Sequence, residues 1–456
     1  MKKVLMIAYS FPPAGGPGVQ RTSKFVKYLR AYGWEPVVLT RDDNNIPLKD
    51  ESLIKDIPED VNVIRTKAWD LSAYPGILGL VGKLIGRKIL IPDSERLWEI
   101  FSRKRAEDII KSHNIDLIYT TSLPYSSHLM AIHLKKKFPD IPWVADFRDE
   151  WTNNPYILDN PYNPIRMNIE RKMERKVLQT ADYLITNTPV MLRNFINNNP
   201  DMNLDKKFCV IPNGYDPDDF KILLNGSNSK VNNRDDNNNG SILVTSDNGV
   251  KYLGVNNKNN DGFRNPSKFT ITYTGAFYGR RKPDIFFHAI GDLIKEEKID
   301  RNKLQIKLMG SFKKEQIQKL IDLHNLDGVV EIFPYIPHEE CLKHMISSDC
   351  LLLIEGAGPG AEAFYTGKVF EYMIAGRPIL AIIPVNGAAA MLIRETSTGL
   401  ISDCTDLKGT KDNIEILYNA WLKGENIYSP NIEEIKKYER NALTAKLAEV
   451  FEKATR

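Results

Sequence analysis

The sequence predicts an α/β protein with two Rossmann-like, doubly wound parallel-sheet domains, chiefly because a strand–loop–helix–strand opening occurs twice. An apolar strand at 4–8 leads through the loop SFPPAGGPG to a helix at about 21–32 and a strand at 34–40. The run FTITYT at 269–274 leads through GAFYGRRKPD to the amphipathic helix IFFHAIGDLI and the strand LQIKLMG. Short apolar strands that alternate with helices are typical of parallel sheets covered by helices on both faces.

A chain of 456 residues is long enough for two domains and an insertion. A segment at about 224–262 is dense in Asn, Asp, Ser and Gly and poor in aromatic residues, which predicts a mobile insertion rather than a folded module. The turn Asn213-Gly214 precedes it and is the expected hinge. The predicted boundaries are 1–212 for the first domain, 213–267 for the hinge and insertion, 268–428 for the second domain and 429–456 for a final helix.

Charge and cysteine usage narrow the function classes. The 62 basic and 58 acidic residues leave a formal net charge of +4, so no global field argues for a nucleic-acid partner. The four cysteines lack paired short spacing, which favours a reducing cytoplasm over a disulfide framework. The apolar run before Pro12 is too short for a signal sequence, and no stretch approaches the roughly 20 apolar residues of a membrane-spanning helix. The expected location is therefore the cytoplasm.

One segment indicates contact with a membrane surface. Within 77–91, apolar residues fall on one helical face, and lysine and arginine are available on the other. This pattern is typical of an interfacial helix beside anionic lipid, and burial against the first domain is the alternative.

The most informative segment is YTGKVFEYMIAGRPILAIIP at 365–384, which predicts a short helix at 369–375 followed by a strand. Gly367 and Lys368 stand at the start of this helix, where free N–H groups and a lysine favour an anion such as phosphate. Glu371 lies one turn further on the same face, where its carboxylate can accept hydrogen bonds from two ribose hydroxyls. The alternative is a solvent-exposed Lys/Glu pair without a ligand.

This segment resembles the donor-site motif of the retaining glycosyltransferase family 4, which has the GT-B fold, and the resemblance covers most of the chain. Glu371 matches the second glutamate of a Glu-x7-Glu pair, which grips the donor ribose. Ala363 stands where the first glutamate is expected, so the role of that glutamate falls to the backbone, to Glu362, to Glu355 or to no residue. The resemblance thus implies a divergent branch, two domains facing a cleft, and a final helix that crosses back to the first domain.

The loop GAFYGRRKPD places three cations at the carboxyl end of a strand, the edge where open α/β sheets bind ligands. In the family, an arginine of this loop, often with a lysine, holds the donor diphosphate. By position the resemblance implies Arg281, with Arg280 and Lys282 beside it. The alternative is a solvated basic turn, but together with Lys368 the same charges would converge on one anion.

The loop of the first half carries Gly16 and Gly18 between a strand and a helix, as a dinucleotide-binding fingerprint does. Arg21 stands at the place of the third glycine, and its bulk opposes the close helix-to-strand packing of that motif. Asp42 and Asp43 follow the second strand, where a dehydrogenase has its ribose carboxylate, so that interpretation stays open. The favoured one, which resembles family 4, is a loop facing the cleft, with Arg21 reaching toward phosphate or acceptor.

The run PWVADFRDEW predicts a wall of the acceptor side. Asp146, Arg148 and Asp149 follow a buried strand, and charges at the carboxyl end of a strand face the cleft of such a fold. Resemblance to a branch of the family with a D-F-R-D pattern implies acceptor contact or proton handling for Asp149. For Asp146, acceptor contact and a structural pair with Arg148 both remain open.

Base recognition in this fold rests largely on backbone and apolar contacts, which we expect around Tyr335 and Ile336. No metal site is expected. His338, Cys341 and His344 do not share one ligand face, and Asp216-Pro217-Asp218 is typical of a turn and helix cap.

The predicted function is a retaining, metal-independent, hexosyltransferase-like glycosyltransferase that needs no cofactor. It moves a sugar from a UDP- or GDP-linked donor to a glycan or lipid-linked acceptor in surface polysaccharide or glycoconjugate synthesis, with Asp149, Arg281 and Lys368 as catalytic residues. Many family members act on lipid-linked acceptors, which favours a peripheral location at the inner face of the membrane. Two alternatives are a GT-B-fold sugar-nucleotide epimerase and a non-catalytic nucleotide-sugar-binding partner of another transferase. The base, sugar, linkage and acceptor do not follow from the sequence.

Overall fold

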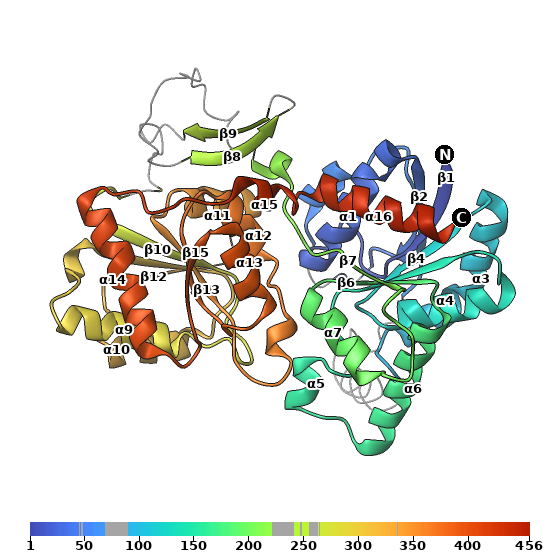
Figure 1. Cartoon of the computed structure of the whole chain (residues 1–456), viewed down its shortest axis with the longest axis horizontal. Coiled ribbons are helices and arrows are strands. Elements are labelled where there is room, and N and C mark those ends of the chain that lie inside the picture. Colours follow the sequence, from blue (N-terminus) through green and yellow to red (C-terminus); the bar gives the residue numbers. More distant parts are fainter. Residues whose placement is uncertain are drawn as a thin grey trace. The chain divides into compact units, whose positions relative to one another are not determined.

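The computed structural model describes residues 1–44, 46, 49–68, 90–220, 241–246, 249–254, 263, 265–334 and 336–456. The chain divides into two compact units, Met1–Asn213 with Arg440–Arg456 (unit 1) and Gly214–Glu439 (unit 2) (Figure 1). The main division thus falls at the turn Asn213-Gly214. Both units contain a parallel sheet with helices, which confirms the predicted pair of Rossmann-like domains.

Unit 1 contains a seven-stranded parallel sheet with the order β3-β2-β1-β4-β5-β6-β7. Its strands are β1 (Lys2–Ile7), β2 (Trp34–Arg41), β3 (Asn62–Thr66), β4 (Leu117–Thr121), β5 (Trp143–Phe147), β6 (Tyr183–Thr186) and β7 (Phe208–Val210). Its helices are α1 (Pro17–Tyr28), α3 (Arg96–His113), α4 (Ser126–Lys137), α5 (Pro155–Asp159), α6 (Pro164–Thr180), α7 (Pro189–Asn198) and α16 (Arg440–Ala454). The central strands are almost wholly buried because both faces of such a sheet are covered.

The first helix begins four residues earlier than predicted, at Pro17. Proline suits the first position of a helix because its φ is already helical and the N–H that it lacks would have no partner there. The helix ends at Tyr28, and a 3-10 turn, Leu29–Tyr32, completes the predicted span. Gly33 then stops it in a left-handed conformation with φ 82°.

The final segment forms two helices, so the single helix predicted for 429–456 was wrong. α15 (Ile432–Lys436) belongs to unit 2 and α16 to unit 1. The helical pattern is interrupted because the backbone at 438–439 pairs with Tyr215, whose N–H donates to Tyr438 O at 3.1 Å. α16 packs on unit 1 through Phe451, which lies edge-to-face with Trp34 at 5.2 Å between ring centroids.

Unit 2 contains a six-stranded parallel sheet with the order β12-β11-β10-β13-β14-β15. Its strands are β10 (Phe269–Thr274), β11 (Leu304–Met309), β12 (Val330–Phe333), β13 (Cys350–Ile354), β14 (Ile379–Ile382) and β15 (Gly399–Ser402). Its helices are α9 (Asp284–Lys295), α10 (Lys314–Leu323), α11 (His338–Ile346), α12 (Lys368–Ile374), α13 (Ala388–Thr396), α14 (Leu407–Lys423) and α15. In Figure 1, α9, α10 and α14 gather on one side of this sheet.

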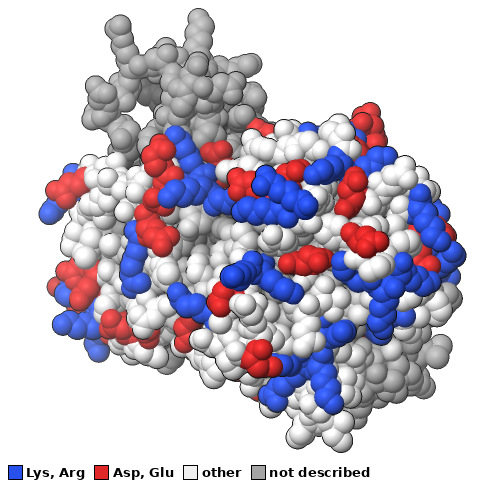
Figure 2. Space-filling model, turned by 45° about the vertical axis from the view of Figure 1, so that its right-hand side comes forward, with Lys and Arg blue, Asp and Glu red and all other residues white. Residues whose placement is uncertain are grey.

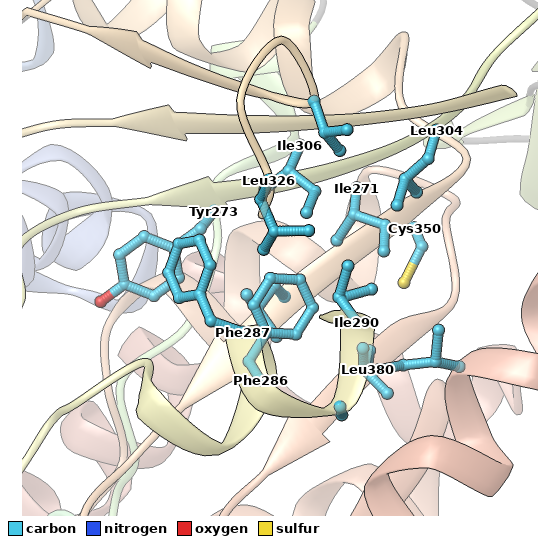
Figure 3. Packing of buried hydrophobic residues seen from close by; sticks show 14 of the residues in the cluster. Ile271, Tyr273, Phe286, Phe287, Ile290, Leu304, Ile306, Leu326, Cys350 and Leu380 are labelled. Atoms are coloured by element: carbon cyan, nitrogen blue, oxygen red, sulfur yellow. The ribbon is translucent and has the colours of Figure 1, made fainter. Parts of the chain in front are cut away.

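The core on that side is made by α9 and the strands beneath it. Phe286, Phe287 and Ile290 of α9 lie against strand residues such as Ile271 and Leu380, all at most 1% exposed (Figure 3). Each such buried side chain contributes about 1.5–3 kcal/mol to folding. The packing fixes the strands whose carboxyl ends form the site described below.

The Asn-rich segment contains a described element that the sequence did not predict. β8 (Ser241–Ser246) and β9 (Gly249–Gly254) form an antiparallel pair. The interfacial helix expected at 77–91 falls largely on 69–89, outside the described residues. Within the described part, no helix is long and apolar enough to span a membrane. Figure 2 shows basic and acidic side chains interspersed over the face in view.

Candidate active site

The candidate site lies at the carboxyl edge of the unit 2 sheet, beside β10 and β13. From β10 the chain proceeds to β11 and β12 on one side, whereas β14 and β15 follow β13 on the other. A crevice forms where the order reverses in this way, and ligands of open α/β sheets bind there. Gly275 follows β10 and Glu355 follows β13, so both come to this edge.

Lys368, the first residue of α12, brings a buried ammonium to this edge. Its Nζ lies 3.9 Å from the centroid of the Tyr273 ring. The residue is partly exposed as a whole, but Nζ is buried and makes no hydrogen bond within the described part of the chain. Burial, and then the charge of Arg281, lower the pKa of Lys368 to about 7. Because a buried charge without a polar partner is costly, this position favours an anionic ligand.

Two glycines allow the backbone to approach this ammonium. A Cβ on Gly275 would lie 2.6 Å from Lys368 Nζ, and one on Gly310 would lie 1.9 Å from Gly275 O. Both glycines have positive φ, +118° and +139°, which other residues rarely adopt. The loop after β10 therefore keeps an open backbone surface in front of the lysine.

Glu355 is the acidic residue that the fold places near the cations. It is 5% exposed and accepts a hydrogen bond from Thr366 N at 3.2 Å. Burial raises the pKa of its carboxyl to about 7, against the opposing charges of Arg281 and Lys368. Glu362, the other acidic candidate for the missing first glutamate, is exposed. Glu355 is thus the better placed of the two.

The three cations of the loop after β10 have different surroundings. The Arg281 guanidinium donates to Tyr278 OH at 2.9 Å, and its charge acts on both Lys368 and Glu355. Arg280 turns instead to the glycine-rich loop 356–360 after β13, where it donates to Pro359 O at 2.8 Å. Lys282 is exposed. Of the three, Arg281 is the one whose charge acts on Lys368.

Glu371 shares the site with two residues of α11. Its Oε1 lies 3.0 Å from His338 Nε2, and the two side chains are 25% and 35% exposed. Burial, and then the charge of Glu371, raise the pKa of Cys341 to about 12. His344 lies elsewhere, against the ring of Phe333 at 5.0 Å between centroids. The helix thus turns His338 and Cys341, but not His344, toward the carboxylate.

The remaining donor-side residues have simple positions. Gly367 precedes α12 as its N-cap, and α12 runs from Lys368 to Ile374, one residue earlier than predicted. With only seven residues, this helix offers little macrodipole, so the side-chain charges matter more. Ile336 is partly buried just before α11, and Tyr335 lies outside the described residues.

The acceptor-side prediction for Arg21 and Asp146 is corrected by their burial. Arg21 Nε donates to Asp146 Oδ2 at 2.8 Å, and both side chains are 0% exposed. Tyr119 OH also donates to Asp146, and Arg21 donates to the carbonyls of Ile211 and Pro212 at 2.8 and 2.7 Å. Both side chains are enclosed and already hydrogen-bonded within unit 1, so their polar groups are not available to an acceptor. The pair instead ties α1 to β5 and to the end of the first segment of unit 1.

Arg148 and Asp146, both among the described residues, are not joined by a hydrogen bond. Arg148 lies instead against the loop before α1 that carries Gly16 and Gly18. It donates to the carbonyls of Ser122 and Leu123. A Cβ on Gly18 would lie 1.6 Å from a nitrogen of its guanidinium, so a larger residue there would displace the Arg148 side chain. Gly16 precedes α1 as its N-cap with φ +111°. Arg148, Gly16 and Gly18 are all partly exposed at the carboxyl edge of the unit 1 sheet.

Asp149 is also partly exposed at this edge. Burial raises the pKa of Tyr125, and the charge of Asp149 adds to that effect. The same charge opposes the burial that lowers the pKa of Arg148. Asp149 is therefore close enough to both groups for its charge to act on them.

Two family models match this sequence. Residues 18–219 match Glycosyltransferase Family 4, and residues 268–420 match Glycosyl transferases group 1. The matches fall in unit 1 and unit 2 respectively, apart from a few residues, and together cover most of the chain. The chain belongs to the family 4 glycosyltransferases. Comparison with curated proteins gave no match.

Solved structures show the GT-B fold of this family 4 chain. Sucrose-phosphate synthase from Thermosynechococcus elongatus is similar with 15% identity and TM-score 0.62, over 99% of each chain. WaaG, a glycosyltransferase involved in lipopolysaccharide biosynthesis, has 13% identity and TM-score 0.53, over 98% of this chain and 99% of that chain. UDP-GlcNAc 2-epimerase from Neisseria meningitidis, solved with UDP-GlcNAc, has 13% identity and TM-score 0.53, over 99% and 100%. The fold alone therefore does not separate transferases from epimerases.

Two residues, Glu355 and His338, belong to the site in the structure although the sequence alone assigned them no firm role. Glu355 is an acidic residue directly after a buried strand, a signal that could have placed it at the carboxyl edge. In the sequence, His338 stands out only as one of three possible metal ligands, with Cys341 and His344. Its pairing with Glu371 joins residues 33 positions apart, so no local pattern could reveal it.

Proposed function

We propose that this family 4 enzyme transfers a sugar from a nucleoside-diphosphate sugar to a glycan or lipid-linked acceptor, with retention at the anomeric carbon and without a metal ion. The observation that carries the proposal is the buried Lys368 ammonium, which makes no hydrogen bond within the described residues and on which the charge of Arg281 acts. A diphosphate would supply the missing acceptor oxygens and compensate both charges.

The chemistry follows from charge. When the bond between the anomeric carbon and the diphosphate oxygen breaks, negative charge grows on the leaving phosphate. Preorganised donors that meet this charge lower the barrier, and removing one such donor typically costs about 10²–10³ in rate. Lys368 and Arg281 would act in this way, and Glu371 would hold the donor ribose.

On the acceptor side we assign Asp149 to the orientation of the attacking hydroxyl. Its position at the carboxyl edge of the unit 1 sheet, where the residue is partly exposed, supports this role. A diphosphate oxygen of the leaving group can take the proton, so Asp149 need not be the general base. We further propose that the enzyme acts in polysaccharide or glycoconjugate synthesis at the inner face of the membrane. This part of the proposal rests on the family resemblance.

The test uses the full-length chain. A thermal-shift screen of nucleotides and nucleotide sugars identifies the donor, and the release of free nucleotide is then measured with and without an acceptor panel. We expect release that depends on acceptor and falls at least 10²-fold in Lys368→Met. Conversion of the nucleotide sugar into its epimer without any acceptor would favour an epimerase, and tight binding without turnover over the whole panel would favour a non-catalytic partner. Either result would overturn the proposal.

A further inference from the structure

The contact between His338 and Glu371 has a defined direction. A carboxylate only accepts hydrogen bonds, so the proton between His338 Nε2 and Glu371 Oε1, 3.0 Å apart, resides on the imidazole nitrogen. His338 is the first residue of α11 and follows Pro337, its N-cap. The donor therefore comes from the start of a helix separate from α12, which carries the acceptor.

This arrangement limits the freedom of the carboxylate. A glutamate side chain that is 25% exposed on a helix can adopt several rotamers, and its plane turns easily. To accept hydrogen bonds from two neighbouring hydroxyls, the carboxylate must hold one plane in one orientation. A fixed N–H on one oxygen selects that orientation before the ligand arrives, which reduces the entropy lost on binding.

We propose that His338 is a positioning residue for donor recognition, which fixes the Glu371 carboxylate so that the site distinguishes a ribose from a 2′-deoxyribose. The inference rests on the proposed function, because it takes Glu371 as the ribose contact. His338 itself touches neither the sugar nor the reacting atoms. The bland alternative is a surface ion pair, which would be indifferent to the ligand.

The substitutions follow from atom positions. The side-chain amide nitrogen of glutamine reaches roughly the position of histidine Nε2, so His338→Gln keeps a donor to Glu371. His338→Leu fills similar space without a donor. His288 offers a control, because it lies on α9 with its Nε2 3.7 Å from Asp292 Oδ2, a histidine–carboxylate ion pair within one helix, and His288→Leu removes that pair on another helix.

The experiment measures equilibrium binding of three probes to the full chain at one pH: the ribonucleoside diphosphate that binds best among UDP, GDP and ADP, its 2′-deoxy counterpart, and inorganic pyrophosphate. We expect the wild type to prefer the ribonucleotide. His338→Leu should reduce this preference about tenfold, in line with one lost hydrogen bond, whereas His338→Gln and His288→Leu should keep it. The affinity for pyrophosphate should stay the same in all variants.

Three outcomes would overturn the inference while the proposed function stands. They are an unchanged ribose preference in His338→Leu, an equal loss in His338→Gln, and an equal loss for pyrophosphate, which would indicate general damage to the site. If the wild type bound none of the nucleotides, the proposed function itself would fail, and the inference with it.

Discussion

At the scale of the residue, Lys368 shows how burial prepares a charge for a ligand. Its pKa is lowered to about 7 by burial and by Arg281, and a bound diphosphate would raise it again. The free-energy cost of burying the Lys368 ammonium without a partner is therefore offset only when the anion is bound. This linkage makes donor binding depend on pH.

We predict that affinity for a nucleotide sugar falls above pH 7. Below pH 7 Lys368 is already charged, so affinity is flat. Above it, binding must take up a proton, and affinity falls by up to about tenfold per pH unit until the raised pKa of the complex is reached. A nucleotide sugar is the right probe because its diphosphate does not titrate in this range. Calorimetry between pH 6 and 9 checks the slope, and Lys368→Arg should make it shallower, since a guanidinium stays charged and leaves only the titration of Glu355. The same slope in that variant would refute the assignment.

The Arg21–Asp146 pair predicts a loss of stability rather than of ligand contact. Asp146→Ala leaves a guanidinium buried without its carboxylate, which costs about 3–5 kcal/mol of unfolding free energy. Arg30→Ala breaks a partly exposed pair with Glu35 in the same unit and should cost less than about 1 kcal/mol. Guanidinium denaturation followed by tryptophan fluorescence compares the two. Equal losses of unfolding free energy would mean that the buried pair stabilises unit 1 no more than the partly exposed pair does.

At the scale of the element, the loop after β10 is held in place by the glycine loop after β13. A Cβ on Gly356 would lie 2.2 Å from Arg280 Cβ and 2.4 Å from Arg280 O. These atoms belong to backbone or lie next to it, so they cannot move without moving the loop. Arg281 is the next residue in that loop, and its position therefore depends on Gly356.

We predict that Gly356→Ala weakens pyrophosphate binding by about 10–100-fold, the loss of one charge-assisted contact from a displaced Arg281. Gly328→Ala is the control: it meets no atom within 4 Å and has φ +73°, so it carries only backbone strain of about 1 kcal/mol. Isothermal titration with pyrophosphate measures both variants. If they behaved alike, the glycine loop would not support the arginine.

The elements themselves followed from periodicity, but their ends and partners did not. The apolar runs that became β1, β2 and β10 were identified to within a residue or two because buried parallel strands have few polar positions. The break between α15 and α16 was missed because it depends on pairing with Tyr215, more than 200 residues away in the sequence. Local pattern carries no information about such a contact.

At the scale of the whole molecule, both sheets and the family were predictable from the sequence. Whether an individual charged side chain is buried or exposed was not. Charged residues that follow a strand were all expected at the crevice. Arg148 and Asp149 are partly exposed at the edge of the sheet, but Asp146 is buried with Arg21. The difference depends on which side of β5 faces α1, and the sequence of one strand cannot decide that.

Buried carboxyls should shape the pH dependence of stability. Burial raises the pKa of Glu174 to about 7, although it accepts a hydrogen bond from Thr152 N at 2.7 Å. The folded state then holds a proton that the unfolded state releases near pH 4.5, so this contribution is present in acid and is lost as pH rises through 7. Burial likewise raises the pKa of Glu150 to about 7.

We predict that Glu174→Gln, which mimics the protonated acid, gains about 2 kcal/mol relative to wild type between pH 5 and pH 8. Glu107→Gln is the control, because hydrogen bonds from Lys137 and His133 lower the pKa of Glu107 to about 2, and its difference from wild type should stay constant over this range. Five of the six tryptophans precede Asn213, so their fluorescence during denaturation reports mainly on unit 1. A difference for Glu174→Gln that does not change with pH would show that this carboxyl is ionised in the folded protein.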